Sequence, residues 1–252
     1  MGRSGKRKVV FKQFEVHDAD CAMKVGTDAL LLGAWSYVSE ARKIIDAGTG
    51  SGIVALMAAQ RALLAEVTGV ELEPNAVIEA KMNGARSPWP SRIRVVEGTI
   101  QAFAGRAEHQ GTFDAFLINP PFFHGKPKSP DEARNLARHD EALPFAEFLD
   151  AAWNLLNSSG ALQVVWPWDR WVELKNGAEA CGFHLRRQAD VCGREGHDPR
   201  RVLSHWVKLQ PEEVPQHEVI CIELGKRIEG QPQLSNRYKE LLSPYVLTWP
   251  EP

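Results

Sequence analysis

The 252-residue sequence predicts an α/β fold in which helices cover a mostly parallel sheet. Strand-like and helix-like apolar stretches alternate along the chain, which is typical of parallel strands joined by helices. With 44% apolar and 25% charged residues, the chain can bury a large core. No apolar run approaches the ~20 residues of a membrane span, and the first residues lack the apolar core of a secretion signal. We therefore expect a cytoplasmic protein.

Short apolar runs bounded by polar or turn-forming residues predict the strands of this sheet. We expect strands at residues 43–47, 66–72, 92–98, 113–119, 161–166, 184–191 and 201–209. We expect helices between them at residues 52–62, 74–85, 143–157 and 170–182. Pro74 stands at a favoured first-turn position of its helix, which ends near a glycine. The last two strands are expected to close the sheet as an antiparallel pair.

Smaller units flank this core at both ends of the chain. Residues 9–16 and 21–25 can pair as a hairpin before a helix at 27–35, which Thr27 or Asp28 could cap. A strand at 218–225 and a short helix follow the core. The predicted division is therefore an N-terminal arm, hairpin and helix at 1–38, a main domain at 39–210, and an extension at 211–252 packed on that domain.

Charge and cysteine content narrow the class of partner. The net charge is −2, but the first twelve residues contain five basic and no acidic residues, so the remaining body has 25 basic against 32 acidic residues. A polyanion such as RNA would therefore bind to local basic surfaces, because the protein as a whole carries no excess of positive charge. Four cysteines without CxxC spacing favour ordinary thiols over a zinc site or a disulfide framework: Cys21, Cys181, Cys192 and Cys221.

The segment IIDAGTGSG, at residues 44–52, is the first candidate binding site. A strand ends in Asp46 and turns into a helix through Gly48, Gly50 and Gly52. Glycines permit positive backbone angles and close approach of a ligand, and a helix start offers free amides. The dinucleotide pattern would need glycine or alanine at position 53, where this sequence has Ile53, which disfavours a nicotinamide or flavin. A tight turn without a ligand is the alternative interpretation.

Glu71 ends the next predicted strand, about twenty residues beyond the glycines. A carboxylate at this position can accept both hydroxyls of a ribose. Taken alone, Glu71 is equally well explained as an exposed charge at a strand end. The glycine turn lacks a P-loop lysine, so the two features together indicate a nucleoside ligand, and adenosine bearing an amino acid would fit.

The segment NPPF, at residues 119–122, ends the strand at 113–119. Two prolines remove two backbone donors and hold Asn119 extended, which leaves the Asn119 side-chain oxygen and the Pro120 carbonyl as acceptors. Such a rim selects a planar primary amine, for example adenine N6, cytosine N4, guanine N2 or a glutamine amide, with Phe122 stacking on its face. A proline-rich turn without a ligand is the alternative.

DAGTGSG, VELE and NPPF, in this order and spacing, resemble the class I S-adenosylmethionine-dependent amino-methyltransferases of the NPPF/Y type. The segments FKQFEVHDADCAMKVGTDALLLGAW, SPWPSRI, ARHD and RVL are similar to the bacterial family of tRNA1(Val) adenine N6-methyltransferases. The similarity extends from about Phe11 to Lys208. It implies a Rossmann-like fold, with a seven-stranded sheet, helices on both faces and a reversed last strand.

The resemblance further implies methyl transfer from S-adenosylmethionine to N6 of an adenosine in tRNA, next to the anticodon of a valine tRNA. It assigns the cofactor to Lys24, Gly26, Thr27, Asp28, Asp46, Gly48, Gly50, Gly52, Glu71, Thr99 and Asn119. It assigns the target base to Asn119, Pro120 and Phe122. Phe122 stands where the family usually has tyrosine, and Thr99 where an acidic residue often contacts the cofactor adenine.

Two other functions remain open at this point: an N5-glutamine methyltransferase acting on protein, and a non-catalytic cofactor-binding protein that interacts with RNA. Candidate RNA contacts are the N-terminal arm, Lys126, Lys128, Arg134, Arg138, Arg194, Arg200 and Arg201. His124 and His139 are interpreted as positioning or surface residues, because the reaction needs no strong base. We expect no membrane and no metal as partners, and a monomer is assumed.

Overall fold

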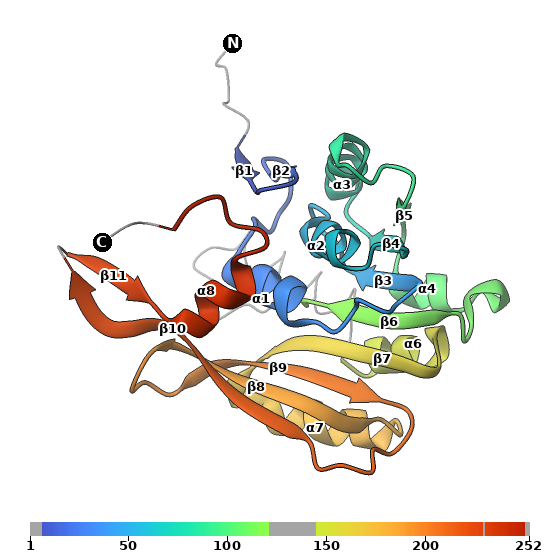
Figure 1. The fold of residues 1–252 in the computed structure, drawn as a ribbon. Coiled ribbons are helices and arrows are strands. Elements are labelled where there is room, and N and C mark those ends of the chain that lie inside the picture. Colours follow the sequence, from blue (N-terminus) through green and yellow to red (C-terminus); the bar gives the residue numbers. More distant parts are fainter. Residues whose placement is uncertain (1–6, 121–144, 229, 250–252) are drawn as a thin grey trace, which may run out of the picture.

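The computed structural model describes residues 7–120, 145–228 and 230–249. Its main feature is a twisted sheet with helices on both faces (Figure 1). The strands of this sheet are β3 (Lys43–Ala47), β4 (Glu66–Glu71), β5 (Ile93–Glu97), β6 (Phe113–Ile118), β7 (Leu156–Pro167), β8 (His184–Arg194), β9 (Pro199–Val207), β10 (Gln216–Ile228) and β11 (Gln231–Leu234). The predicted α/β class is confirmed.

The strand order is β11-β10-β8-β9-β7-β6-β3-β4-β5. Strands β3 to β7 are parallel, and β9 lies antiparallel between β7 and β8. This confirms the mostly parallel sheet with a reversed strand. The expected number of strands was wrong, because β10 pairs with β8 and β11 pairs with β10, which extends the seven strands to nine.

Successive side chains of a strand point to opposite faces of the sheet. Both faces are apolar here, and helices cover both. One apolar cluster contains Ile44 of β3 and is covered by α1 (Thr27–Trp35) and α2 (Ile53–Arg61). The other contains the next residue, Ile45, and is covered by α4 (Ile100–Ala104), α6 (Phe145–Leu155) and α7 (Trp171–Ala180). A further helix, α3 (Pro74–Arg86), lies beside β5. The predicted helices are found, and α4 is an addition.

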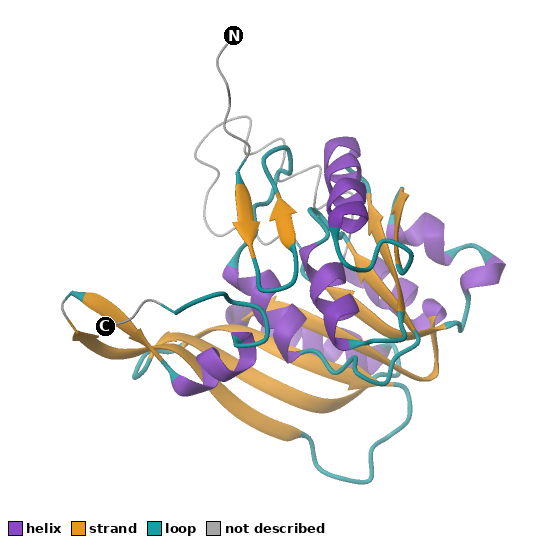
Figure 2. Ribbon diagram, turned by 45° about the horizontal axis from the view of Figure 1, so that its top comes forward, coloured by secondary structure: helices purple, strands orange, loops and turns teal. Residues whose placement is uncertain are grey.

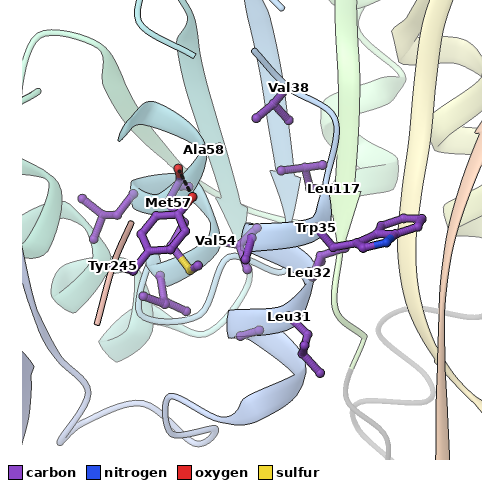
Figure 3. Close-up of a cluster of buried hydrophobic side chains, with 14 of the residues drawn as sticks. Leu31, Leu32, Trp35, Val38, Val54, Met57, Ala58, Leu117 and Tyr245 are labelled. Atoms are coloured by element: carbon purple, nitrogen blue, oxygen red, sulfur yellow. Dashed lines mark hydrogen bonds between the residues drawn. The ribbon is translucent and has the colours of Figure 1, made fainter. Parts of the chain in front are cut away.

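Helices α1 and α2 pack against each other in one apolar cluster, in which Figure 3 labels Leu32 of α1 and Met57 of α2. A Cβ atom at Gly33 would lie 2.6 Å from the Met57 sulfur, so a larger residue would force the Met57 side chain to move. Tyr245, after α8 (Asn236–Leu242), is fully buried against the same cluster, and its hydroxyl donates to the Met57 carbonyl at 3.2 Å. The C-terminal extension is thus part of this core. The predicted domain boundaries at residues 38 and 210 stay a prediction.

The N-terminal hairpin has a different second strand from the one expected. Strand β1 (Lys8–Val10) pairs with β2 (Glu15–His17), so the turn lies inside the segment that was expected to form one strand (Figure 2). Residues 21–25 form no strand. The Lys24 ammonium donates to the carbonyl oxygens of residues 18, 19 and 21 at 2.8 Å each, which folds this segment into a compact loop.

The predicted capping of α1 by Thr27 or Asp28 was also wrong. Gly26 is the N-cap residue, and no side chain caps this helix. The Asp28 carboxylate instead accepts from the Arg201 guanidinium at 2.8 Å. Of the helices that the structure describes, none is both long and apolar enough to cross a membrane.

Candidate active site

The residues that follow four neighbouring strands meet at one edge of the sheet. In the register, Ala47 of β3 pairs with both Val70 of β4 and Ile118 of β6. Glu71 pairs in turn with the last residue of β5. Because these strands are parallel, their carboxyl ends lie at one edge of the sheet, which is where ligands bind in such sheets. The predicted site segments after β3, β4, β5 and β6 are therefore brought together.

The glycine turn after β3 is held by backbone bonds and leaves open space above it. The amides of Gly48 and Thr49 donate to the Val70 carbonyl at 2.8 and 3.0 Å. Gly48 and Gly50 have φ of 66° and 56°, the left-handed region that favours glycine. A Cβ atom at either position would meet nothing within 4 Å. The turn is thus shaped for close approach of a ligand.

Asp46 is buried beneath this turn, with 2% of its surface exposed. One carboxylate oxygen accepts from the Thr49 hydroxyl at 2.5 Å and from the Ala55 amide, in the first turn of α2, at 3.0 Å. Burial raises the pKa of Asp46 to about 7, while these two hydrogen bonds oppose the rise. The carboxylate therefore fixes the turn against the start of α2. Direct contact between Asp46 and a cofactor stays a prediction.

Glu71 at the end of β4 is fixed by three backbone amides. Its carboxylate accepts from Gly50 at 2.8 Å, Leu72 at 2.8 Å and Glu73 at 2.9 Å. An ionised carboxylate offers about four lone-pair sites, so roughly one remains for a ligand hydroxyl. The sequence predicted acceptance of both ribose hydroxyls, and the structure shows that Glu71 also binds the glycine turn.

Thr99, after β5, caps helix α4 by accepting from the Ala102 amide at 3.1 Å. This bond commits the hydroxyl oxygen to the helix. Contact between Thr99 and a cofactor adenine stays a prediction.

Asn119 follows β6 directly and carries a polar side-chain atom without a partner in the described part of the chain. Its Oδ1 atom is buried and has no hydrogen-bond partner among the described residues. Pro120 is buried beside it. Buried polar oxygens are usually bonded in native proteins, so this acceptor is free to receive a hydrogen bond from a ligand that donates. Phe122 lies outside the described residues.

The KVGTD segment is used mainly to build the local structure. Lys24 holds the preceding loop, Gly26 caps α1, and Asp28 binds Arg201. Thr27 is exposed at the start of α1. A contact between this segment and the cofactor stays a prediction.

The basic candidates for RNA contact differ in their surroundings. Arg201 is engaged by Asp28, and Arg194 lies 3.7 Å from Glu223. Arg200 is exposed. The remaining basic candidates after NPPF, together with both histidines of that segment, lie outside the described residues: Lys126, Lys128, Arg134, Arg138, His124 and His139.

Neither a disulfide nor a metal cluster is found among the described residues, where all four cysteines are free thiols. Sequence reasoning missed two features of this edge. Thr49 fixes Asp46, for which the pattern of a buried acid three residues before a threonine was a signal. Trp168 lies just past β7, and the run WPW at the end of an apolar strand was the signal for it.

Comparison with known proteins identifies the family. The family model described as Methyltransferase small domain matches residues 21–171. A tRNA1(Val) (adenine(37)-N6)-methyltransferase of Bacteroides thetaiotaomicron is 37% identical over 94% of this chain and 96% of its own length. A Bacteroides fragilis protein of the same name is 42% identical over 80% of this chain and 84% of its own.

Solved structures share the fold at low sequence identity. A protein described as a predicted O-methyltransferase from Agrobacterium tumefaciens has a TM-score of 0.66 and 19% identity, covering 86% of this chain and 96% of its own. The Pyrococcus horikoshii protein TYW2, solved in complex with MeSAdo, has a TM-score of 0.59 and 11% identity, covering 83% and 74%. The chain therefore belongs to the Methyltransferase small domain family and, within it, to the tRNA1(Val) (adenine(37)-N6)-methyltransferases.

Proposed function

We propose that this protein transfers a methyl group from S-adenosylmethionine to N6 of an adenosine in tRNA, namely adenosine 37 of a valine tRNA. The names of relatives that align over most of both chains support this substrate. Maturation of tRNA in the cytoplasm is the setting that this activity implies.

The single observation that carries the proposal is the open acceptor at the carboxyl end of β6. Asn119 Oδ1 is buried without a partner in the described part of the chain, and it follows the strand residue that pairs with Ala47 at the glycine turn. An exocyclic amine supplies two N–H donors, one for Asn119 Oδ1 and one for the Pro120 carbonyl. A donor ligand would therefore satisfy a group that this fold buries.

The residues at the glycine turn fit S-adenosylmethionine. Space above Gly48 and Gly50 is open, and the Glu71 carboxylate keeps about one acceptor site for a ribose hydroxyl. Asp46 would support cofactor binding indirectly, because its carboxylate fixes the glycine turn against the start of α2. When bound, the cofactor supplies a methyl group on a positively charged sulfonium, which is already a strong electrophile.

The chemical task left to the protein is to prepare and orient the amine. The lone pair of adenine N6 is delocalised into the ring, which makes this nitrogen a poor nucleophile. Acceptance of both N–H hydrogens by Asn119 and Pro120 favours a more tetrahedral nitrogen and directs its lone pair. Orientation of this kind can contribute about 7–11 kcal/mol of barrier reduction. The N6 proton can leave after transfer, so no strong base is required.

The proposed base must leave the anticodon-loop stack to reach this edge. Unstacking a loop base costs a few kcal/mol, which aromatic contacts offset in RNA-binding proteins. Phe122 is proposed to make such a contact.

Two arguments separate this proposal from its rivals. A non-catalytic RNA-interaction protein would have no use for an unsatisfied acceptor beside the cofactor crevice. A glutamine amide would fit the same acceptors, so the choice of adenosine over protein rests on the relatives.

The test is a cell-free reaction with labelled S-adenosylmethionine and either unmodified valine tRNA or total protein from the same extract. Label in the RNA, recovered as N6-methyladenosine by nucleoside mass spectrometry, supports the proposal. Label confined to protein glutamine, or absent from both, contradicts it. Asn119→Ala serves as the inactive control.

A further inference from the structure

A hollow of about 730 Å³ opens at the sheet edge, apart from the residues assigned to the cofactor and the target base. Its lining comes from two places, Trp168 and Asp169 after β7, and residues 197–201, which span the end of the β8–β9 turn and the start of β9. The volume lies within the ~300–1,000 Å³ of typical ligand pockets. It is therefore large enough for a nucleotide.

The hollow lies close to the open acceptor of Asn119. Strands β6 and β7 are parallel neighbours, and Ile118 pairs with Val164. Asn119 is thus level with Val165, and Trp168 follows three residues later. Strand β7 ends at Pro167, roughly 7 Å beyond the level of Asn119 at ~3.3 Å per residue, and Trp168 follows it directly. A nucleotide in the hollow would be a near neighbour of the base held at Asn119.

Two successive arginines of β9, Arg200 and Arg201, line the hollow. Arg201 is bound to Asp28 of α1, which fixes one wall. Arg200 is exposed and has no ion pair among the described residues, so its guanidinium is available. Arg200 is the extra residue at a bulge of β9, where Arg201 pairs with Val191 and Pro199 with Cys192. The free cation and the indole of Trp168 both line the hollow.

This combination fits single-stranded RNA. Unstacked bases pack on aromatic side chains, and arginine forms paired hydrogen bonds with phosphate. The carboxylates of Asp169 and Asp198 in the same lining can accept hydrogens from base amino groups or ribose hydroxyls. The lining thus offers an aromatic ring for the base, an arginine for the phosphate and carboxylates for amino or hydroxyl groups. A small inorganic anion would bind only the arginine.

We propose that this hollow is the subsite for a nucleotide of the tRNA anticodon loop that neighbours the methylated adenosine. The inference rests on the proposed function and names the protein surface that holds the substrate beside its target base. Trp168 stacks on the neighbouring base, and Arg200 binds its phosphate. The hollow thereby holds the loop open while the target base occupies the Asn119 site.

Beyond the hollow, the ribbon of β10 and β11 extends the same edge (Figure 1). The Glu195 amide donates to the Glu223 carbonyl at 2.8 Å, which ties the ribbon to the β8–β9 turn. Lys226 and Arg227 are exposed on this ribbon. They would meet phosphates farther along the RNA.

Arg200→Ala tests the subsite directly, because the side chain is exposed and its removal leaves the fold intact. Binding of a fluorescent valine anticodon stem-loop is measured by anisotropy over a series of salt concentrations. We expect the Kd to rise about tenfold, and the slope of log K against log salt to fall by about 0.7–1, the value of one phosphate contact. The KM for RNA should rise while kcat at saturating RNA stays unchanged.

Arg94→Ala is the matched control. Arg94 is an exposed arginine on β5, the strand at the opposite edge of the sheet from β11. It has no ion pair among the described residues. This variant should bind RNA as the unaltered protein does. Trp168→Ala should weaken binding and Trp168→Phe should restore most of it, because the flat ring is kept.

Unchanged Kd and salt slope in both Arg200→Ala and Trp168→Ala would overturn the subsite. If the unaltered protein methylates RNA and these variants bind normally, the subsite alone fails. If the unaltered protein binds RNA with the Arg200-dependent slope but transfers no methyl group, the subsite stands and the proposed function fails.

Discussion

The glycine turn after β3 and the end of β6 lie at the same sheet edge but differ in whether their polar side chains are hydrogen-bonded within the protein. At the glycine turn, the carboxylates of Asp46 and Glu71 are both bonded to hydroxyl or backbone donors of the protein. At the end of β6, Asn119 Oδ1 is buried with no partner among the described residues. The first region is completed by folding. The second keeps an acceptor free, which the proposed function assigns to the amine of the substrate.

The largest effect is expected from Asn119→Ala. This change removes the open acceptor, so kcat for methylation should fall at least about 10²–10³-fold, the effect of losing one well-placed polar group in an active site. Cofactor affinity should be nearly unchanged, because the glycine turn does not use this side chain. Kinetics and calorimetric titration of the same preparation measure both. Equal loss of activity and cofactor affinity would contradict the contrast between the two regions.

Gly50→Ala should weaken cofactor binding about tenfold, because its methyl group enters the open space above the turn and Gly50 has positive φ. Gly111→Ala is the matched control: φ is 65° and a Cβ there also meets nothing within 4 Å, but the residue precedes β6 at the other end of the strand. Both should lose about 1–2 kcal/mol of folding stability. Equal cofactor affinity in the two variants would show that the turn does not contact the ligand.

Asp46→Asn should alter the pH dependence of stability. The pKa of Asp46 is raised from its ordinary 3.8 to about 7, so folding favours the protonated form. That contribution is complete below pH 3.8 and is lost as the pH rises through 7, at up to about 1.4 kcal/mol per pH unit.

Asparagine keeps an oxygen for Thr49 and Ala55 without the charge. The free energy of unfolding of Asp46→Asn, measured by denaturant between pH 5 and 8, should therefore decline less steeply with pH than that of the unaltered protein. Parallel curves for the two proteins would rule out this role.

The smallest effect is expected from Tyr245→Phe, which belongs to neither region. It removes the hydrogen bond to the Met57 carbonyl and should cost about 1 kcal/mol of unfolding free energy. The kcat and the cofactor Kd should be unchanged. A selective loss of activity would show that the C-terminal extension affects the site.

Much of the main sheet could be predicted because its strands and helices carry strong local patterns. The strand at 43–47 was predicted at its observed bounds, and the parallel order then placed Glu71 and Asn119 at one edge. The hairpin was wrong because Lys24 binds three carbonyls and folds residues 21–25 into a loop, which no periodicity shows. The pairing of Asp28 with Arg201 joins residues 173 positions apart and could not be read from spacing.

The central claim is that the acceptors at Asn119 select an amine. It is tested most directly by competition binding of two valine anticodon stem-loops, one with adenosine and one with inosine at the target position. Inosine presents an oxygen in place of the amine, which leaves both acceptors unpaired. The protein should prefer adenosine about tenfold or more, and Asn119→Ala should reduce that preference to near one. Equal binding of the two RNAs by the unaltered protein would contradict the claim.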